Sequence, residues 1–229
     1  MTTIGIANAT LVNDGQVKQT SLVIRNGLID RIITNNHDEI YSLKLDQLIE
    51  AKGKLLFPGV IDDQVHFREP GLTHKGDMYS ESKAGVAGGV TSFMEMPNTN
   101  PQTTTNELLD DKFKLAAEKS MANFSFYLGA TNDNIEEIAK VNPRKVCGIK
   151  IFMGSSTGNM LVDSLESLEK IFKQSPVLIS THCEDEATIK ENLVKYKELY
   201  GEDIPVRYHA EIRSEQACFL SSSLAVSLA

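Results

Sequence analysis

Three side chains able to hold a divalent metal interrupt or end apolar runs of this sequence. His66 lies near the end of the run VIDDQVHF, Lys150 lies inside VCGIKIFM, and His182 ends VLISTH. Imidazole is a common metal ligand, and a lysine amine that takes up CO2 becomes an anionic carbamate, which can bridge two divalent metals. Lysine is rarely buried without a partner, so the plainer interpretation of Lys150 is an ion pair with a carboxylate near the strand end.

Polar residues alternate along the first of these runs. Side chains two apart in a strand face the same side, so Asp62, Gln64, His66 and Arg68 are expected to point one way. A buried polar stripe requires a metal, a ligand or ion-pair partners, which favours a functional site; an edge strand with a solvated face is the alternative. Asn98 follows the second apolar run, in MPNTNP, and is either a site residue or a turn residue.

The elements that must position these residues follow from the spacing of the apolar runs. Five runs, beginning near residues 60, 90, 123, 146 and 177, alternate with helical stretches. Such spacing is typical of repeated β-helix-β units around a parallel sheet. We therefore predict an α/β fold over residues 58–229, a partial TIM-type (β/α) barrel with about five of the eight strands. The alternative is a complete, doubly wound five-stranded sheet, and the strand order distinguishes the two.

Residues 1–57 have a different pattern, with short alternating runs separated by tight turns. Asn26-Gly27 between apolar residues is a strong hairpin signal. We predict a small antiparallel β-sandwich segment here, too short for a strong core of its own. Helical periodicity continues up to Ala229, so the chain is expected to be an incomplete barrel. Its unpaired sheet edges favour association, for example as a homo-oligomer.

Composition and charge exclude several classes of protein. The 229 residues carry a net charge of −8, which argues against a nucleic-acid partner because no basic surface would neutralise phosphates. No run of about 20 apolar residues is present, so no membrane span is expected. Three cysteines without a CxxC pair, and no visible signal sequence, favour a reducing cytoplasm. A small molecule is the expected partner.

The segments PGVIDDQVHFREPG, MPNTNP, GIKIFMGSSTGNM and THCED together resemble signatures of the amidohydrolase superfamily, in its cyclic-amidohydrolase branch. Within that branch the chain is similar to the dihydroorotases over its whole length, and it matches the N-terminal part of that family. The resemblance implies a zinc-dependent enzyme, with two zinc ions per complete chain. Such an enzyme reversibly converts carbamoyl-aspartate to dihydroorotate in pyrimidine biosynthesis.

The resemblance also implies roles for single residues. His66, Lys150 and His182 match metal ligands of the family, with Lys150 carboxylated and bridging the ions. Arg68 and Asn98 match the side chains that hold the substrate carboxylate, a task that suits the planar fork of a guanidinium. The family's general-base Asp would lie beyond the end of this sequence. The 229-residue chain is therefore expected to be inactive alone.

One position departs from the family pattern. Gln64 stands where the family has the first histidine of a His-x-His pair, and an amide is a poorer zinc ligand than imidazole. This departure favours one alternative, a non-catalytic homologue that serves as a scaffold for a partner enzyme. The other alternative is a dihydropyrimidinase, hydantoinase or allantoinase, which shares the metal site but acts on a different ring.

Overall fold

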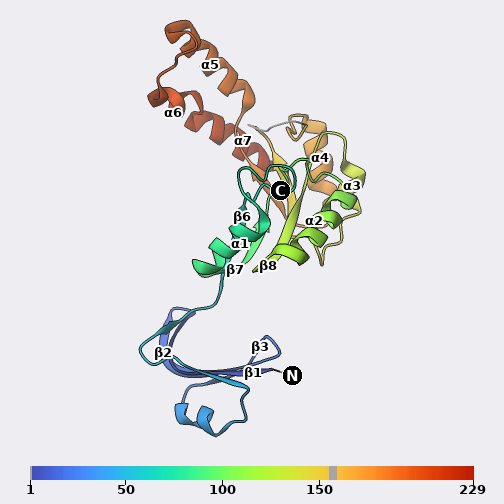
Figure 1. The fold of residues 1–229 in the computed structure, drawn as a ribbon. Coiled ribbons are helices and arrows are strands. Elements are labelled where there is room, and N and C mark those ends of the chain that lie inside the picture. Colours follow the sequence, from blue (N-terminus) through green and yellow to red (C-terminus); the bar gives the residue numbers. More distant parts are fainter. Residues whose placement is uncertain (1, 155–158) are drawn as a thin grey trace. The chain divides into compact units, whose positions relative to one another are not determined.

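The computed structural model describes residues 2–154 and 159–229, and these divide into two compact units, residues 1–59 and 60–229. Residues 155–158, inside the segment GIKIFMGSSTGNM, lie outside the described residues. Each unit has its own sheet (Figure 1).

The first unit is built on an antiparallel meander, as the hairpin signal predicts. Its elements are β1 (Thr3–Asn13), β2 (Gln16–Arg25), β3 (Leu28–Ile33), η1 (His37–Ser42), β4 (Gln47–Glu50) and β5 (Leu55–Leu56). Asn26 and Gly27 join β2 to β3 with φ of 51° and 80°, the positive values that this two-residue turn requires. The short strands β4 and β5 join β1 in parallel, so the sheet is mixed at that edge.

The second unit contains one parallel sheet whose strands lie in chain order. The strands are β6 (Val60–Val65), β7 (Val90–Glu95), β8 (Asn123–Gly129), β9 (Gly148–Phe152) and β10 (Ile179–His182). Their spatial order is β10-β9-β8-β7-β6, with no reversal. A doubly wound sheet reverses its strand order at a switch point. The sheet is therefore half of a (β/α) barrel, as predicted, and the doubly wound alternative is wrong.

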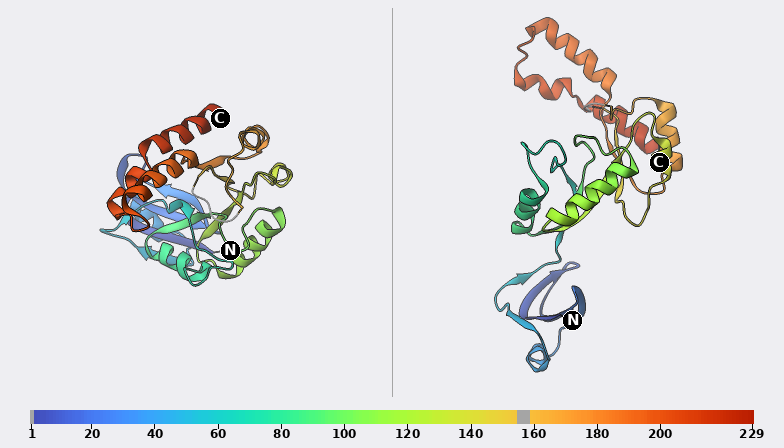
Figure 2. Two further views of the ribbon diagram at one scale, coloured as in Figure 1. Left: turned by 90° about the horizontal axis from the view of Figure 1, so that it is seen from above. Right: turned by 45° about the vertical axis from the view of Figure 1, so that its right-hand side comes forward.

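Helices follow the strands of the second unit (Figures 1 and 2). They are α1 (Met78–Ala87), α2 (Asn106–Lys119), α3 (Ile135–Ala139), α4 (Leu165–Gln174), α5 (Glu186–Tyr200), η2 (Val206–Tyr208), α6 (His209–Ile212) and α7 (Glu215–Leu228). Polar side chains accept the free backbone N–H groups at several helix starts, as Asp77 does for α1 and Thr105 for α2. Figure 2 shows the hairpin of α5 and α6 projecting away from the sheet.

The main core lies between the sheet and the helices that cover one of its faces. Phe93, Phe126 and Ile151 from the strands pack there with Leu109 of α2 and Ile171 of α4, and each of the five is at most 2% exposed. The opposite face of the sheet is therefore the one on which polar side chains can gather. None of the helices in the described part of the chain is long and apolar enough to cross a bilayer.

Candidate active site

The predicted ligands share the face of the sheet opposite the helices. Ile149 and Ile151 belong to the helix-side core, so the intervening Lys150 points to the other face. The same alternation applies on β6, where Val65 and Phe67 pack in that core on either side of His66. On β10, Ile179 and Cys183 pack against the core, which places His182 on the inner face. His66 follows β6 and His182 ends β10, at the carboxyl edge of the sheet where (β/α) barrels carry their sites, whereas Lys150 lies in the middle of β9.

Lys150 is the most deeply buried of these residues, at 3% exposed. Its Nζ lies 5.2 Å from the centre of the Phe152 ring, and it forms no ion pair with any residue in 2–154 or 159–229. Burial lowers the pKa of its amine. The plainer interpretation, a carboxylate partner near the strand end, finds no such partner in the described part of the chain.

His66 is half-buried and is held by Asn98 from the loop after β7. Nδ1 of His66 lies 2.8 Å from Oδ1 of Asn98. A carbonyl oxygen only accepts, so Nδ1 carries the proton and Nε2 keeps its lone pair for a metal. Burial lowers the pKa of His66, and the bond to Asn98 partly opposes that shift. The positive charges of Arg68 and Lys150 lower the pKa of His66 further, because both lie within electrostatic reach of the imidazole.

Arg68 begins a tightly packed loop after β6. Its backbone adopts a φ of 70°, and its N–H donates to Oε1 of Glu95 at 3.2 Å. Gly71, with a φ of 81°, lies so close to the next loop that a Cβ there would sit 1.8 Å from the backbone oxygen of Asn100. Only glycine fits this contact. The guanidinium of Arg68 makes no ion pair with the described residues, which leaves it available for an anion.

A buried ion pair behind the site was not predicted from the sequence. Glu95 of β7 and Lys112 of α2 are 0% and 1% exposed, and Oε2 lies 2.6 Å from Nζ. Lys112 also donates to the backbone oxygen of Met96 at 3.0 Å. The carboxylate of Glu95 accepts the backbone N–H groups of Phe67 and Arg68. Glu95 therefore holds the chain where it leaves β6, and a charged residue inside the apolar run VTSFMEMP was the signal for it.

The imidazole of His182 contacts a neighbouring carboxylate. Its Nε2 lies 2.7 Å from Oε2 of Glu184, and its ring centre lies 6.2 Å from that of Phe152. It makes no hydrogen bond with His66 or Lys150 in the described structure. Gln64, the departure from the family pattern, is exposed. Its backbone N–H donates to Oδ1 of Asp62 at 3.2 Å.

The donor set fits a metal site only with Lys150 in modified form. No group of three or more His, Cys, Asp or Glu within the described ranges is arranged to hold a metal ion. Two imidazoles and a buried amine are the donors on the inner face, and an amine cannot bind metal while protonated. A carbamate on Lys150 would add the anionic oxygens that the set lacks. The chemistry of these residues therefore fits a metal held by His66, His182 and a carboxylated Lys150.

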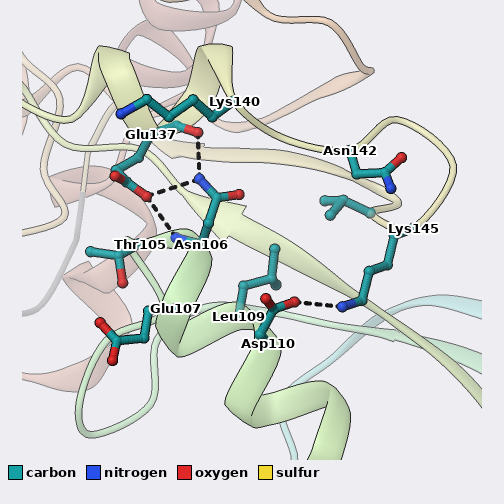
Figure 3. Close-up of a pocket in the computed structure, with 10 residues that line it drawn as sticks. Thr105, Asn106, Glu107, Leu109, Asp110, Glu137, Lys140, Asn142 and Lys145 are labelled. Atoms are coloured by element: carbon teal, nitrogen blue, oxygen red, sulfur yellow. Dashed lines mark hydrogen bonds and ion pairs between the residues drawn. The ribbon is translucent and has the colours of Figure 1, made fainter.

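A pocket of about 600 Å³ lies away from these residues (Figure 3). It is lined by the start of α2, by residues of α3 and by the segment before β9. Nδ2 of Asn106 donates to Glu137 at 2.8 Å, and Lys145 pairs with Asp110 at 2.5 Å. None of the predicted site residues lines this pocket, and much of its polar lining is bonded internally.

Comparisons with known proteins agree with this architecture. The sequence model of the dihydro-orotase-like family matches residues 53–218. The chain belongs to the dihydro-orotase-like family. It is 32% identical to a dihydroorotase of Methanosarcina acetivorans, over 97% of this chain and 46% of that protein. It is 34% identical to an allantoinase of Deinococcus radiodurans, over 69% of this chain and 36% of that protein.

A solved member of the same superfamily has nearly the same fold. The L-hydantoinase (dihydropyrimidinase) from Arthrobacter aurescens matches with a TM-score of 0.90 and 26% identity, over 100% of this chain and 50% of that one. A further match is the multifunctional protein CAD of Squalus acanthias, 35% identical over 58% of this chain and 6% of that protein. This dihydro-orotase-like chain spans about half the length of the first curated relatives that it matches. Dihydroorotase, allantoinase and L-hydantoinase are cyclic amidohydrolases.

Proposed function

We propose that this chain carries the zinc-binding N-terminal part of a dihydroorotase, which interconverts carbamoyl-aspartate and dihydroorotate in pyrimidine biosynthesis. The observation that supports this most is Lys150, which is buried in the middle of β9 with no acidic partner among the described residues. A structural lysine would gain a carboxylate there. An amine that becomes a carbamate needs no carboxylate partner.

The proposed ligands are His66, Lys150 and His182. Burial lowers the pKa of Lys150, which raises the fraction of neutral amine that can attack CO2. The nitrogen lone pair forms the N–C bond, and one proton leaves to solvent. When bound, zinc lowers the pKa of a water molecule and polarises the amide carbonyl of the substrate.

Arg68 and Asn98 are proposed to hold the substrate carboxylate. Oδ1 of Asn98 is engaged by His66, and its Nδ2 makes no hydrogen bond with the described residues, so two donors remain. The guanidinium of Arg68 supplies a bidentate fork for the same anion. A site built to bond a carboxylate discriminates against rings that lack one, which favours dihydroorotate over hydantoin.

Two alternatives are retained for specific reasons. A hydantoinase, dihydropyrimidinase or allantoinase is supported by the structural match to L-hydantoinase and by the allantoinase relative. A non-catalytic scaffold protein is supported by Gln64, which cannot replace imidazole at full strength. The first differs from a dihydroorotase in its substrate, and the second in having no zinc.

The proposal is tested by labelling the carbamate. The chain incubated with zinc and 13C-bicarbonate should show a carbamate carbon signal that Lys150→Arg abolishes. The surface variant Lys145→Arg should keep the signal. A chain without the signal, or without bound zinc, would favour the scaffold alternative.

Substrate class is tested by binding. Dihydroorotate should shift the Nε–Hε signal of Arg68 in an NMR titration, whereas hydantoin, which has no carboxylate, should not. Equal shifts with both would favour the hydantoinase alternative. With zinc and bicarbonate added, the 229-residue chain alone should not turn over dihydroorotate, and robust turnover would contradict that expectation.

A further inference from the structure

A chain of three side chains links the helices after β10 to His182. Nε of Arg213 donates to Oε1 of Glu184 at 2.7 Å, and Nη2 of Arg213 contacts Oε2 of the same carboxylate. That Oε2 also lies 2.7 Å from Nε2 of His182. A bidentate guanidinium fixes a carboxylate in direction as well as in position. The imidazole is therefore linked through Glu184 to a residue that follows α6.

The backbone around Arg213 is held by several hydrogen bonds. Nδ2 of Asn192, on α5, donates to the backbone oxygen of Ile212 at 3.1 Å. Ser214 caps α7 by accepting the N–H of Ala217 at 3.3 Å. The N–H of Asp185, next to Glu184, donates to the backbone oxygen of Ala217 at 2.9 Å. Both ends of the Arg213–Glu184 contact are thus attached to the same helical assembly.

The contact has a chemical consequence for His182. An ionised carboxylate only accepts hydrogen bonds, so a neutral His182 must carry its proton on Nε2. Its Nδ1 then keeps the lone pair, and no described residue hydrogen-bonds to that atom. His66 has the opposite tautomer, because its Nδ1 carries the proton and donates to Asn98.

We propose that Glu184 and Arg213 are positioning residues, which select the Nε2–H tautomer of His182 and hold its ring before any metal binds. The proposal deepens the proposed function and rests on it for the role of His182 as a ligand. The tautomer itself does not depend on metal, substrate or turnover. An ordinary structural ion pair would contribute to stability without fixing the tautomer.

The test uses 15N-labelled histidine in the metal-free 229-residue chain at about pH 8, above the ordinary imidazole pKa of about 6.5. In the wild type, the His182 signals should show a protonated Nε2 and an unprotonated Nδ1. Glu184→Gln should give a mixture of tautomers, because an amide both donates and accepts. Arg213→Lys keeps the charge but loses the fork, and should give a smaller shift toward the mixture.

Controls separate positioning from folding. Arg31→Lys, in the surface pair Arg31–Glu39 at 2.7 Å, should leave the His182 signals unchanged. Thermal unfolding reports whether each variant is folded, and Arg213→Lys provides the readout if Glu184→Gln does not fold. A wild-type His182 protonated on Nδ1, or one whose tautomer survives in the folded variants, would overturn the proposal.

A zinc titration separates this inference from the function on which it rests. Glu184→Gln should weaken zinc binding by about 10–100-fold, the usual effect of losing a carboxylate that orients a ligating histidine. A wild-type chain that binds no zinc would contradict the proposed function. The tautomer measurement would still decide the role of Glu184 and Arg213.

Discussion

At the scale of one residue, the buried amine of Lys150 is expected to lower the free energy of unfolding. The residue is 3% exposed and its amine has no acidic partner within the described residues, and burying an amine without such a partner is costly. Lys150→Met keeps the length of the side chain and removes the amine. The free energy of unfolding at about pH 7, measured by chemical denaturation, should rise by about 1–3 kcal/mol.

The control for this prediction is an exposed lysine. Lys145→Met removes a surface amine paired with Asp110 and should change the free energy of unfolding by less than about 1 kcal/mol. If Lys150→Met were less stable than the wild type, the amine would contribute to the fold, as through its contact with the Phe152 ring. That result would remove the main support for a carbamate.

At the scale of elements, the Glu95–Lys112 pair joins β7 to α2 and holds the chain beyond β6. Lys112→Met leaves a buried carboxylate without its cation and should lower the free energy of unfolding by about 3–5 kcal/mol. The double variant Glu95→Gln with Lys112→Met removes both charges and should recover most of that loss. If the two changes were additive in denaturation experiments, the pair would not be coupled.

The Lys112→Met variant should also depend on pH in a defined direction. Burial raises the pKa of Glu95 above its unfolded value, and the charge of Lys112 opposes that shift. A group with a raised native pKa contributes stability below its unfolded pKa of about 4.3, which is lost as the pH rises through the native pKa. Without Lys112 the native pKa of Glu95 rises further. The loss in free energy of unfolding of Lys112→Met relative to the wild type should therefore be smaller at about pH 5 than at about pH 8. An equal loss at both pH values would contradict this.

Local patterns predicted the elements and the face on which His66 lies, whereas the partners of the site residues could not be predicted. The period-two alternation around His66 predicted the direction of its side chain, because alternation depends only on neighbouring residues. Pairs such as His66 with Asn98, 32 residues apart, and Glu184 with Arg213, 29 residues apart, form only when strands and helices assemble. The buried pair of Glu95 with Lys112 was not predicted, because a charged residue inside an apolar run does not identify its partner.

At the scale of the whole molecule, the parallel sheet has two edge strands among the described residues, β6 and β10. Ile61 of β6 is 61% exposed, and Leu178, just before β10, is 70% exposed. Exposed apolar strand edges promote association, and lysine at an edge suppresses it. The isolated chain should therefore sediment as a concentration-dependent mixture of monomers and larger species in analytical ultracentrifugation.

Ile61→Lys should shift that mixture toward monomer without a loss of secondary structure, because the added charge opposes pairing along the edge of β6. Val194→Lys is the matched control, since it places the same charge on an equally exposed position of α5, away from both edges. If both variants reduced association equally, general hydrophobicity or net charge would be the cause. If only Ile61→Lys reduces association, the interaction occurs through the open edge of the half-barrel at β6, where the first strand of a closed barrel would pair with the last.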